Sequence, residues 1–249
     1  MVSNRFFTIL FYIFFGISGI VFFAIAVIIW LLTVLFDKRL DILHFYTQIW
    51  GSVYLWVVPS WHVEVIGRKK IDKKKTYVIV SNHQSQLDIL VAMSLFRHFK
   101  WVSKREVFNI PLVGWNMRLN RYIELKRGDK KSIIKMMKDC DRAIKTGSSV
   151  FIFPEGTRSE TGILKRFKPG AFTIAKRNKV PILPVAISGT IKVGHKNSAI
   201  LNRKCRFSIK VLDEIPYESF ADKEAEEIAE IIHNIIGKHV AEHTESENI

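Results

Sequence analysis

The sequence has no charged side chain between Phe6 and Phe36. A helix over that run would be about 45 Å long, which exceeds the ~30 Å hydrocarbon thickness of a bilayer. A buried helix of a soluble domain is a poor alternative for so long an uncharged run. A cleaved signal peptide also fits poorly, because its apolar region is only ~7–15 residues long. The segment is therefore predicted to be a membrane anchor.

The anchor leaves two arrangements open. Gly16, Ser18 and Gly19 could bend the apolar run in its middle. Aromatic side chains of the kind that settle at headgroup depth follow at Phe45, Tyr46, Trp50, Tyr54, Trp56 and Trp61. We expect two helices, one inserted and one at the interface, with a single tilted span as the alternative. The predicted division is a membrane-anchoring segment over residues 1–61 and an α/β domain over residues 62–249.

Cysteine and acidic residues are both scarce. Cys140 and Cys205 are the only two cysteines, and they have no paired spacing, so both are expected to be reduced, small hydrophobic residues. There are 23 acidic and 38 basic residues, a net charge of +15. Such a surface suits nucleic acid, an anionic bilayer or a phosphorylated substrate.

The sequence lacks an RNP-like aromatic run and a zinc-finger spacing, so nucleic acid is not expected as a partner. Beside a membrane anchor, the phospholipid bilayer is the expected partner, at ~1 kcal/mol per basic residue close to the surface. The positive-inside tendency places the basic domain at the cytoplasmic face of the cell membrane.

After residue 62, short β-rich runs alternate with helical periods. Strands are expected over residues 76–81, 100–103, 148–153, 180–187 and 206–212, and helices over residues 88–99, 129–146, 169–178 and 223–243. This alternation predicts an α/β domain with a mixed, largely parallel sheet flanked by helices. Pro181 and Pro184 favour a sheet edge for the run at 180–187, because proline cannot donate to a ladder.

One histidine and one aspartate, His83 and Asp88, lie in the polar loop after the first of these strands. If the strand ends near Ser81 and the helix begins near Ser85, the loop can bring the imidazole over the helix start. Asp88 would then accept a hydrogen bond from one ring nitrogen and leave the other free as a base. The alternative is that Asp88 or Ser85 only caps the helix and His83 is a surface residue.

A second polar turn follows the strand at 148–153. After Pro154 it carries Glu155, Gly156, Thr157 and Arg158. Glycine permits close backbone approach, and the threonine hydroxyl and the guanidinium suit a phosphate. Further cations, Lys104 and Arg127 among them, follow the strand at 100–103. An ordinary β-turn and a solvated basic face are the alternatives.

Four blocks in this order resemble the glycerolipid acyltransferase family, and most of all its bacterial 1-acyl-sn-glycerol-3-phosphate acyltransferases. The blocks are NHQSQLD at 82–88, the stretch from Lys104 through Pro111 and Gly114 to Arg127, FPEGTRS at 153–159, and VPILPVAI at 180–187. A histidine and an aspartate at this spacing are common by chance, whereas FPEGTRS is specific. The resemblance covers residues 76–190.

The resemblance implies transfer of a fatty acyl group to the 2-hydroxyl of lysophosphatidic acid, which makes phosphatidic acid for phospholipid biosynthesis. The donor would be a thioester of acyl carrier protein or of coenzyme A, with no other cofactor. His83 would be the general base, oriented by Asp88. The resemblance also implies a phosphate site made of Lys104, Arg127, Thr157 and Arg158 and shaped by Glu155 and Gly156.

Three alternatives remain at this point. The acceptor could be glycerol-3-phosphate or another lysophospholipid, because both chemistries need a base and an anion pocket. The chain could also be a catalytically silent lipid-binding module that uses the same basic face. No metal site is expected, because His83 and Asp88 have no third ligand close by in the sequence.

Overall fold

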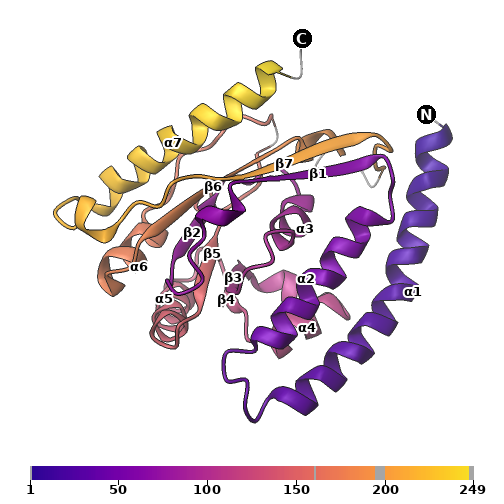
Figure 1. The fold of residues 1–249 in the computed structure, drawn as a ribbon, viewed down its shortest axis with the longest axis horizontal. Coiled ribbons are helices and arrows are strands. Elements are labelled where there is room, and N and C mark those ends of the chain that lie inside the picture. Colours follow the sequence, from indigo (N-terminus) through magenta and orange to yellow (C-terminus); the bar gives the residue numbers. More distant parts are fainter. Residues whose placement is uncertain (1, 160, 194–199, 247–249) are drawn as a thin grey trace.

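A seven-stranded mixed sheet forms the centre of the computed structural model, which describes residues 2–159, 161–193 and 200–246 (Figure 1). The strand order is β1-β7-β6-β2-β5-β3-β4, and all neighbouring strands are parallel except β6 and β7. The bounds are β1 Trp61–Ile66, β2 Val78–Ser81, β3 Phe99–Lys104, β4 Ile123–Leu125, β5 Ser149–Ile152, β6 Ile182–Ser188 and β7 Cys205–Val211. The expected mixed, largely parallel sheet is confirmed.

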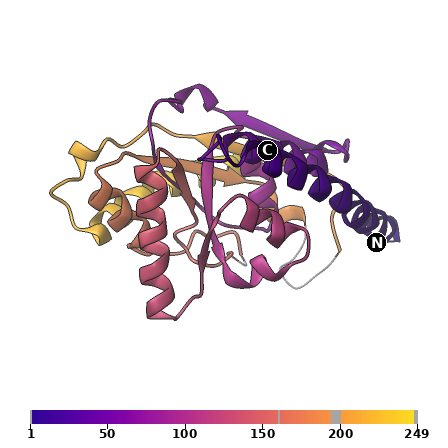
Figure 2. The same cartoon turned by 90° about the horizontal axis from the view of Figure 1, so that it is seen from below.

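Helices cover both faces of the sheet, as the parallel pairing requires. One face carries α1 (Val2–Thr33), α2 (Asp41–Trp56), α3 (Leu87–Met93) and α4 (Val113–Leu119), and the other carries α5 (Lys130–Lys145), α6 (Gly170–Asn178) and α7 (Ala225–Ser246). Figures 1 and 2 show α1 and α5 on opposite sides of the molecule. Two apolar cores result, one between each helical layer and the sheet.

The strand β6 lies inside the sheet, so the expectation that residues 180–187 form an edge was wrong. All its residues are buried, between β2 and β7. The carbonyl of Pro184 accepts from the backbone N–H of Leu212, just beyond the end of β7, and the ladder with β7 begins only at Val185. Pro184 therefore lies one residue outside the antiparallel β6–β7 ladder, where a backbone N–H donor is not needed.

The N-terminal helix α1 continues without interruption from Val2 to Thr33, so the expected bend near Gly16 is absent. A Cβ on Gly19 would meet Leu112 Cδ1 at 3.3 Å and Tyr54 Oη at 3.8 Å. Gly19 thus allows α1 to pack closely against Leu112 and Tyr54 and does not form a turn. Among the described residues, this helix alone is long and apolar enough to cross a membrane, and only 11% of its most apolar window is buried.

The second helix, α2, joins α1 to the domain. The Tyr46 hydroxyl donates to the carbonyl of Phe22 in α1 at 3.0 Å. On its other side, α2 packs on α3, and Thr47 Oγ1 accepts from Asn120 Nδ2 at 3.0 Å. The two helices and the α/β layers thus form a continuous packed structure, and the apolar N-terminal helix suggests that the protein associates with a membrane.

Candidate active site

Polar residues follow the carboxyl ends of four neighbouring parallel strands. The loop of residues 82–88 follows β2, the turn of residues 153–159 follows β5, Lys104 ends β3, and Arg127 comes two residues after β4. These strands are adjacent in the order β2-β5-β3-β4 and run in one direction, so all four ends lie at one edge of the sheet. Ligands of open α/β sheets bind at this edge.

His83 and Asp88 contact each other, which is one of the two arrangements that the sequence left open. Nδ1 of His83 lies 2.7 Å from Oδ2 of Asp88; the imidazole is 13% exposed and the carboxylate is fully buried. An ionised carboxylate only accepts, so Nδ1 carries the proton, and in the neutral ring Nε2 is left as an acceptor. The free nitrogen is therefore the one that can take a proton from another molecule.

The Asp88 carboxylate also fixes the loop around it. Oδ2 accepts from the backbone N–H groups of Gln84 at 2.6 Å and Ser85 at 2.9 Å. Oδ1 accepts from the hydroxyl of Thr190. Hydrogen bonds to an ionised acceptor are stronger than those between neutral groups. Asp88 thus orients the imidazole and holds the loop that carries it.

The FPEGTRS turn forms a second wall of the same site. The ring of Phe153 stacks on the imidazole of His83, with centroids 4.1 Å apart and an interplanar angle of 12°. The backbone N–H of Ser159 donates to the carbonyl of His83 at 2.8 Å. The two polar loops predicted from the sequence therefore touch, and the imidazole is held at its edge by Asp88 and at its face by Phe153.

Glu155 faces the protein and not the solvent. Its side chain is buried; Oε1 accepts from the backbone N–H of His83 at 2.6 Å and Oε2 from that of Lys165 at 3.1 Å. Burial raises the pKa of this carboxyl group, whereas the two N–H donors oppose that shift. Glu155 therefore braces the loop of His83 from inside the protein.

Gly156, Thr157 and Arg158 follow on the outside of the turn. Gly156 has φ +71°, a conformation that favours glycine, and an added Cβ would come within 3.0 Å of Lys168 Nζ. Within the described part of the chain, no hydrogen bond or ion pair engages the guanidinium of Arg158; its backbone carbonyl accepts from Lys165 Nζ at 3.1 Å. The geometry leaves this guanidinium available to a ligand.

The charge of Glu106 acts on both Lys104 and Arg127. Lys104 Nζ pairs with Glu106 at 3.2 Å, in an exposed ion pair. Desolvation lowers the pKa of Arg127, and the charge of Glu106 opposes that shift. Lys104 ends β3 and Arg127 follows β4, so both cations come from the same edge of the sheet as the FPEGTRS turn after β5.

Two residues of the site, Asn82 and Thr190, were not singled out from the sequence. Asn82 was part of the NHQSQLD block, and its side chain extends the β2–β6 ladder, since Nδ2 donates to the carbonyl of Ile187 and Oδ1 accepts from its N–H, both at 2.8 Å. Thr190 is 102 residues from Asp88 along the chain. Only the order of the strands in the sheet reveals that contact.

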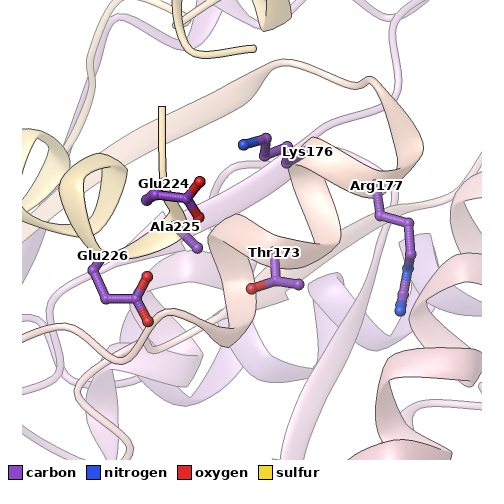
Figure 3. A pocket seen from close by; sticks show the side chains of 6 residues that line it. All are labelled: Thr173, Lys176, Arg177, Glu224, Ala225 and Glu226. Carbon is purple, nitrogen blue, oxygen red and sulfur yellow. The ribbon is translucent and has the colours of Figure 1, made fainter. Parts of the chain in front are cut away.

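A pocket of about 350 Å³ opens elsewhere, between α6 and the start of α7 (Figure 3). Thr173, Lys176, Arg177, Glu224, Ala225 and Glu226 line it. The helix α6 leads back from the FPEGTRS edge to the amino end of β6, so its last turn lies near the opposite edge of the sheet. Lys176 Nζ and Arg177 are already bonded to the carbonyl of Lys223 and to Asp141. This pocket is separate from the site of His83.

Comparisons with known proteins agree with the motifs. A family model described as Acyltransferase matches residues 62–188, slightly more than half of the chain. The chloroplastic 1-acyl-sn-glycerol-3-phosphate acyltransferase of Brassica napus is 39% identical over 180 residues, which cover 72% of this chain and 52% of the relative. The 1-acyl-sn-glycerol-3-phosphate acyltransferase of Pseudomonas aeruginosa is 34% identical over 146 residues, 57% of this chain and 56% of the relative.

These matches span about half the length of the curated relatives. A match to a solved structure covers nearly the whole of both chains. The crystal structure of the 1-acyl-sn-glycerophosphate acyltransferase of Thermotoga maritima matches with a TM-score of 0.83, over 98% of this chain and 97% of that one. The sequence identity is 24%, so this likeness establishes the fold.

Proposed function

The chain belongs to the acyltransferase family, and from that premise we propose that it transfers a fatty acyl group from a thioester to the 2-hydroxyl of 1-acyl-sn-glycerol-3-phosphate. The product is phosphatidic acid. The observation that carries this proposal is the imidazole of His83, bonded at Nδ1 to Asp88 and stacked on the FPEGTRS turn. Relatives whose names state this activity support the choice of acceptor.

In the reaction, Nε2 of His83 removes the proton of the acceptor hydroxyl as its oxygen attacks the thioester carbonyl. The tetrahedral intermediate collapses, the C–S bond breaks, and the thiolate takes the proton from the imidazolium. General base catalysis of this kind contributes ~10²–10⁴ in rate. Asp88 keeps the imidazole in the required tautomer and stabilises the imidazolium. No covalent intermediate with the protein is needed.

The acceptor phosphate binds among the cations at the same edge of the sheet. Arg158 and Thr157 come from the turn that stacks on His83, and Lys104 and Arg127 come from the two strands beyond it. Neighbouring strands lie ~4.8 Å apart, so the turn of Thr157 and Arg158 is one strand spacing from the base, and Lys104 and Arg127 are two and three spacings away. Glu155 holds the shape of this turn from inside, and Gly156 supplies its left-handed backbone conformation.

The bilayer supplies the acceptor, and the outward faces of α1 and α2 are suited to it. Large apolar side chains on these faces are more than half exposed, including Phe6, Ile13, Ile17, Ile20, Leu31, Leu32 and Phe45. Trp115 of α4 is 47% exposed beside them and contacts Phe23. We propose that this surface lies in the cytoplasmic leaflet of the cell membrane, where a lipid acceptor and a water-soluble thioester meet.

Packing along α1 supports a helix that lies in the interface over one that crosses the bilayer. Near its start, Asn4 Nδ2 donates to Asn202 Oδ1 at 3.3 Å and Thr8 Oγ1 accepts from the N–H of Leu201 at 2.9 Å. Near its end, Ala26 is fully buried against the chain. A spanning orientation would carry these parts of the domain into the hydrocarbon, where unpaired backbone groups are costly.

Product mass after reaction with defined substrates tests the proposal. The purified full chain in detergent is given acyl-coenzyme A or acyl carrier protein thioester, with lysophosphatidic acid, glycerol-3-phosphate or lysophosphatidylcholine as acceptor. We expect phosphatidic acid from the first acceptor, and the two donor arms identify the thioester. Preferred acylation of either other acceptor would change the assigned substrate. Transfer to none of them would leave a lipid-binding module.

A further inference from the structure

The hydroxyl of Thr190 is fully buried in the protein and donates to Oδ1 of Asp88. This oxygen is the one that does not contact His83, because the imidazole and the backbone N–H groups of Gln84 and Ser85 all bond to Oδ2. Without a donor on Oδ1, the carboxylate can rotate about its Cβ–Cγ bond and turn Oδ2 away from Nδ1. We propose that Thr190 is a positioning residue for the acyl transfer, and that it acts on His83 through Asp88.

The chain is shaped to deliver this hydroxyl. Strand β6 ends at Ser188, and Gly189 follows with φ +84°. A Cβ at Gly189 would lie 2.1 Å from the carbonyl oxygen of Arg206 in β7, a distance that no side chain can occupy. Only glycine permits this turn at that depth. The turn sends Thr190 back toward α3, where Asp88 occupies the first helical turn.

A second set of contacts holds the two segments in register. The side chain of Asn82, next to His83, makes two 2.8 Å hydrogen bonds with the backbone of Ile187 in β6. The His83 loop and the end of β6 are therefore tied together at the point from which Thr190 reaches Asp88. Asn82 reaches from the loop to β6, and Thr190 reaches from just beyond the end of β6 to Asp88, so the two segments are joined by buried polar contacts in both directions.

The test compares three substitutions that differ in the donor they keep. Thr190→Val has nearly the same shape and no donor, Thr190→Cys keeps a weak S–H donor, and Thr190→Ser keeps the hydroxyl. The assay uses an acyl thioester and lysophosphatidic acid in detergent micelles. We expect kcat to fall about tenfold or more in Thr190→Val, less in Thr190→Cys and about twofold or less in Thr190→Ser, because hydrogen bonds to charged groups are strong. The acceptor KM should change little in all three.

Thr173→Val is the matched control, because the Thr173 hydroxyl donates to the carbonyl of Pro169 within α6 at 3.1 Å and lies away from His83. Its kcat should equal that of the unmodified chain. A double-mutant cycle separates positioning from general stability: on an Asp88→Asn background, Thr190→Val should lower the residual rate by no more than about twofold, because interacting residues act as a unit.

Several results would overturn the inference. These are an unchanged kcat in Thr190→Val, an equal loss in Thr190→Ser and Thr190→Val, or multiplicative losses in the double-mutant cycle. If Thr190→Val does not fold, the comparison of the serine and cysteine variants decides. The inference rests on the proposed function, and different experimental results would contradict each of them. A wild-type chain that transfers no acyl group contradicts the function, whereas an active wild type with an equally active valine variant contradicts only the role of Thr190.

Discussion

The backbone N–H of His83 donates a 2.6 Å hydrogen bond to Oε1 of Glu155. One buried carboxylate therefore joins the loop after β2 to the turn after β5, and its second oxygen accepts from Lys165 further along the chain. The catalytic geometry proposed for His83 depends on this brace as much as on Asp88. The contact also explains why the turn contains a carboxylate that does not face the solvent.

Replacing Glu155 by glutamine should destabilise the protein. A glutamine amide offers one acceptor oxygen, so its NH2 group would face the N–H of either His83 or Lys165. An unsatisfied buried donor costs ~1–3 kcal/mol, and we expect a loss of that size in the free energy of unfolding at neutral pH. Urea titration measures it. Glu226→Gln, at an exposed position of α7, is the control, and an equal small effect in both variants would refute the brace.

The same carboxyl group should influence stability as a function of pH. Burial raises the pKa of Glu155 above its ordinary value of 4.5. The folded state therefore holds this proton more tightly than the unfolded state, and the stabilising contribution is complete below the ordinary pKa and lost as the pH rises through the raised one. The wild-type advantage over Glu155→Gln in the free energy of unfolding should grow as the pH is lowered from 7 toward 4.5. An advantage that grows with increasing pH would contradict this.

Arg158→Ala should weaken binding of the phosphorylated acceptor. The Arg158 guanidinium has no protein partner among the described residues, so its loss removes ligand contacts and leaves no unpaired group behind. A hydrogen bond to a charged group contributes ~1.5–3 kcal/mol, which corresponds to an acceptor KM about 10–100 times higher. Steady-state kinetics with lysophosphatidic acid measures this. Arg142→Ala on α5 should have no effect, and an unchanged KM in Arg158→Ala would remove Arg158 from the phosphate site.

Two charges on the outward face of α1 should impair membrane binding without unfolding the protein. Ile13 and Ile17 are 53% and 64% exposed and lie one helical turn apart. Ile13→Asp with Ile17→Asp should lower partition onto anionic vesicles at least about tenfold, because burying a carboxylate in lipid costs up to ~2.5–3.5 kcal/mol. Activity in detergent should be retained. Ile231→Asp on α7 is the control, and equal vesicle binding by both proteins would exclude α1 from the bilayer.

Deleting α1 is a less specific test of the same idea. Phe7 and Phe11 of this helix pack on Trp61, with ring centroids 5.9 and 5.4 Å apart. Removing the helix would uncover a core that it shares with the sheet. Lost activity would then report misfolding as well as lost membrane contact, whereas point charges on the exposed face leave the packed face intact.

The local parts of the site were predictable from sequence. An apolar run predicted the strand before His83, and the polar residues after it predicted the loop. Asp88, a residue type that favours the first turn of a helix, predicted where the helix begins. Because only four residues lie between His83 and Asp88, a short loop is enough to bring the two side chains together. The turn after Phe151-Ile152-Phe153 was likewise marked by Pro154 and Gly156.

The non-local parts were not predictable in this way. Pro184 favoured a sheet edge, because the sequence does not reveal that β7 ends beside it. The three residues of β4 were too few to show a pattern. The strand β1 alternates polar and apolar residues between Pro59 and Gly67, but it begins at the predicted end of the anchor, where no strand was expected. Thr190 reaches Asp88 only through the pairing of β6 with β2. A single sequence contains no information on such pairings beyond the hydrophobic pattern.

The rate of acyl transfer by His83→Ala, measured with a thioester and lysophosphatidic acid, tests the central claim most directly. Among the described residues, the imidazole bonds to Asp88 and stacks on Phe153, and the backbone bonds of His83 to Glu155 and Ser159 do not require the ring, so the variant should fold. His62→Ala, at an exposed position of β1, is the matched control. We predict that kcat falls ~10²–10⁴-fold in His83→Ala, with the thermal midpoint and acceptor affinity nearly unchanged. A folded His83→Ala protein that turns over at the wild-type rate would contradict the account.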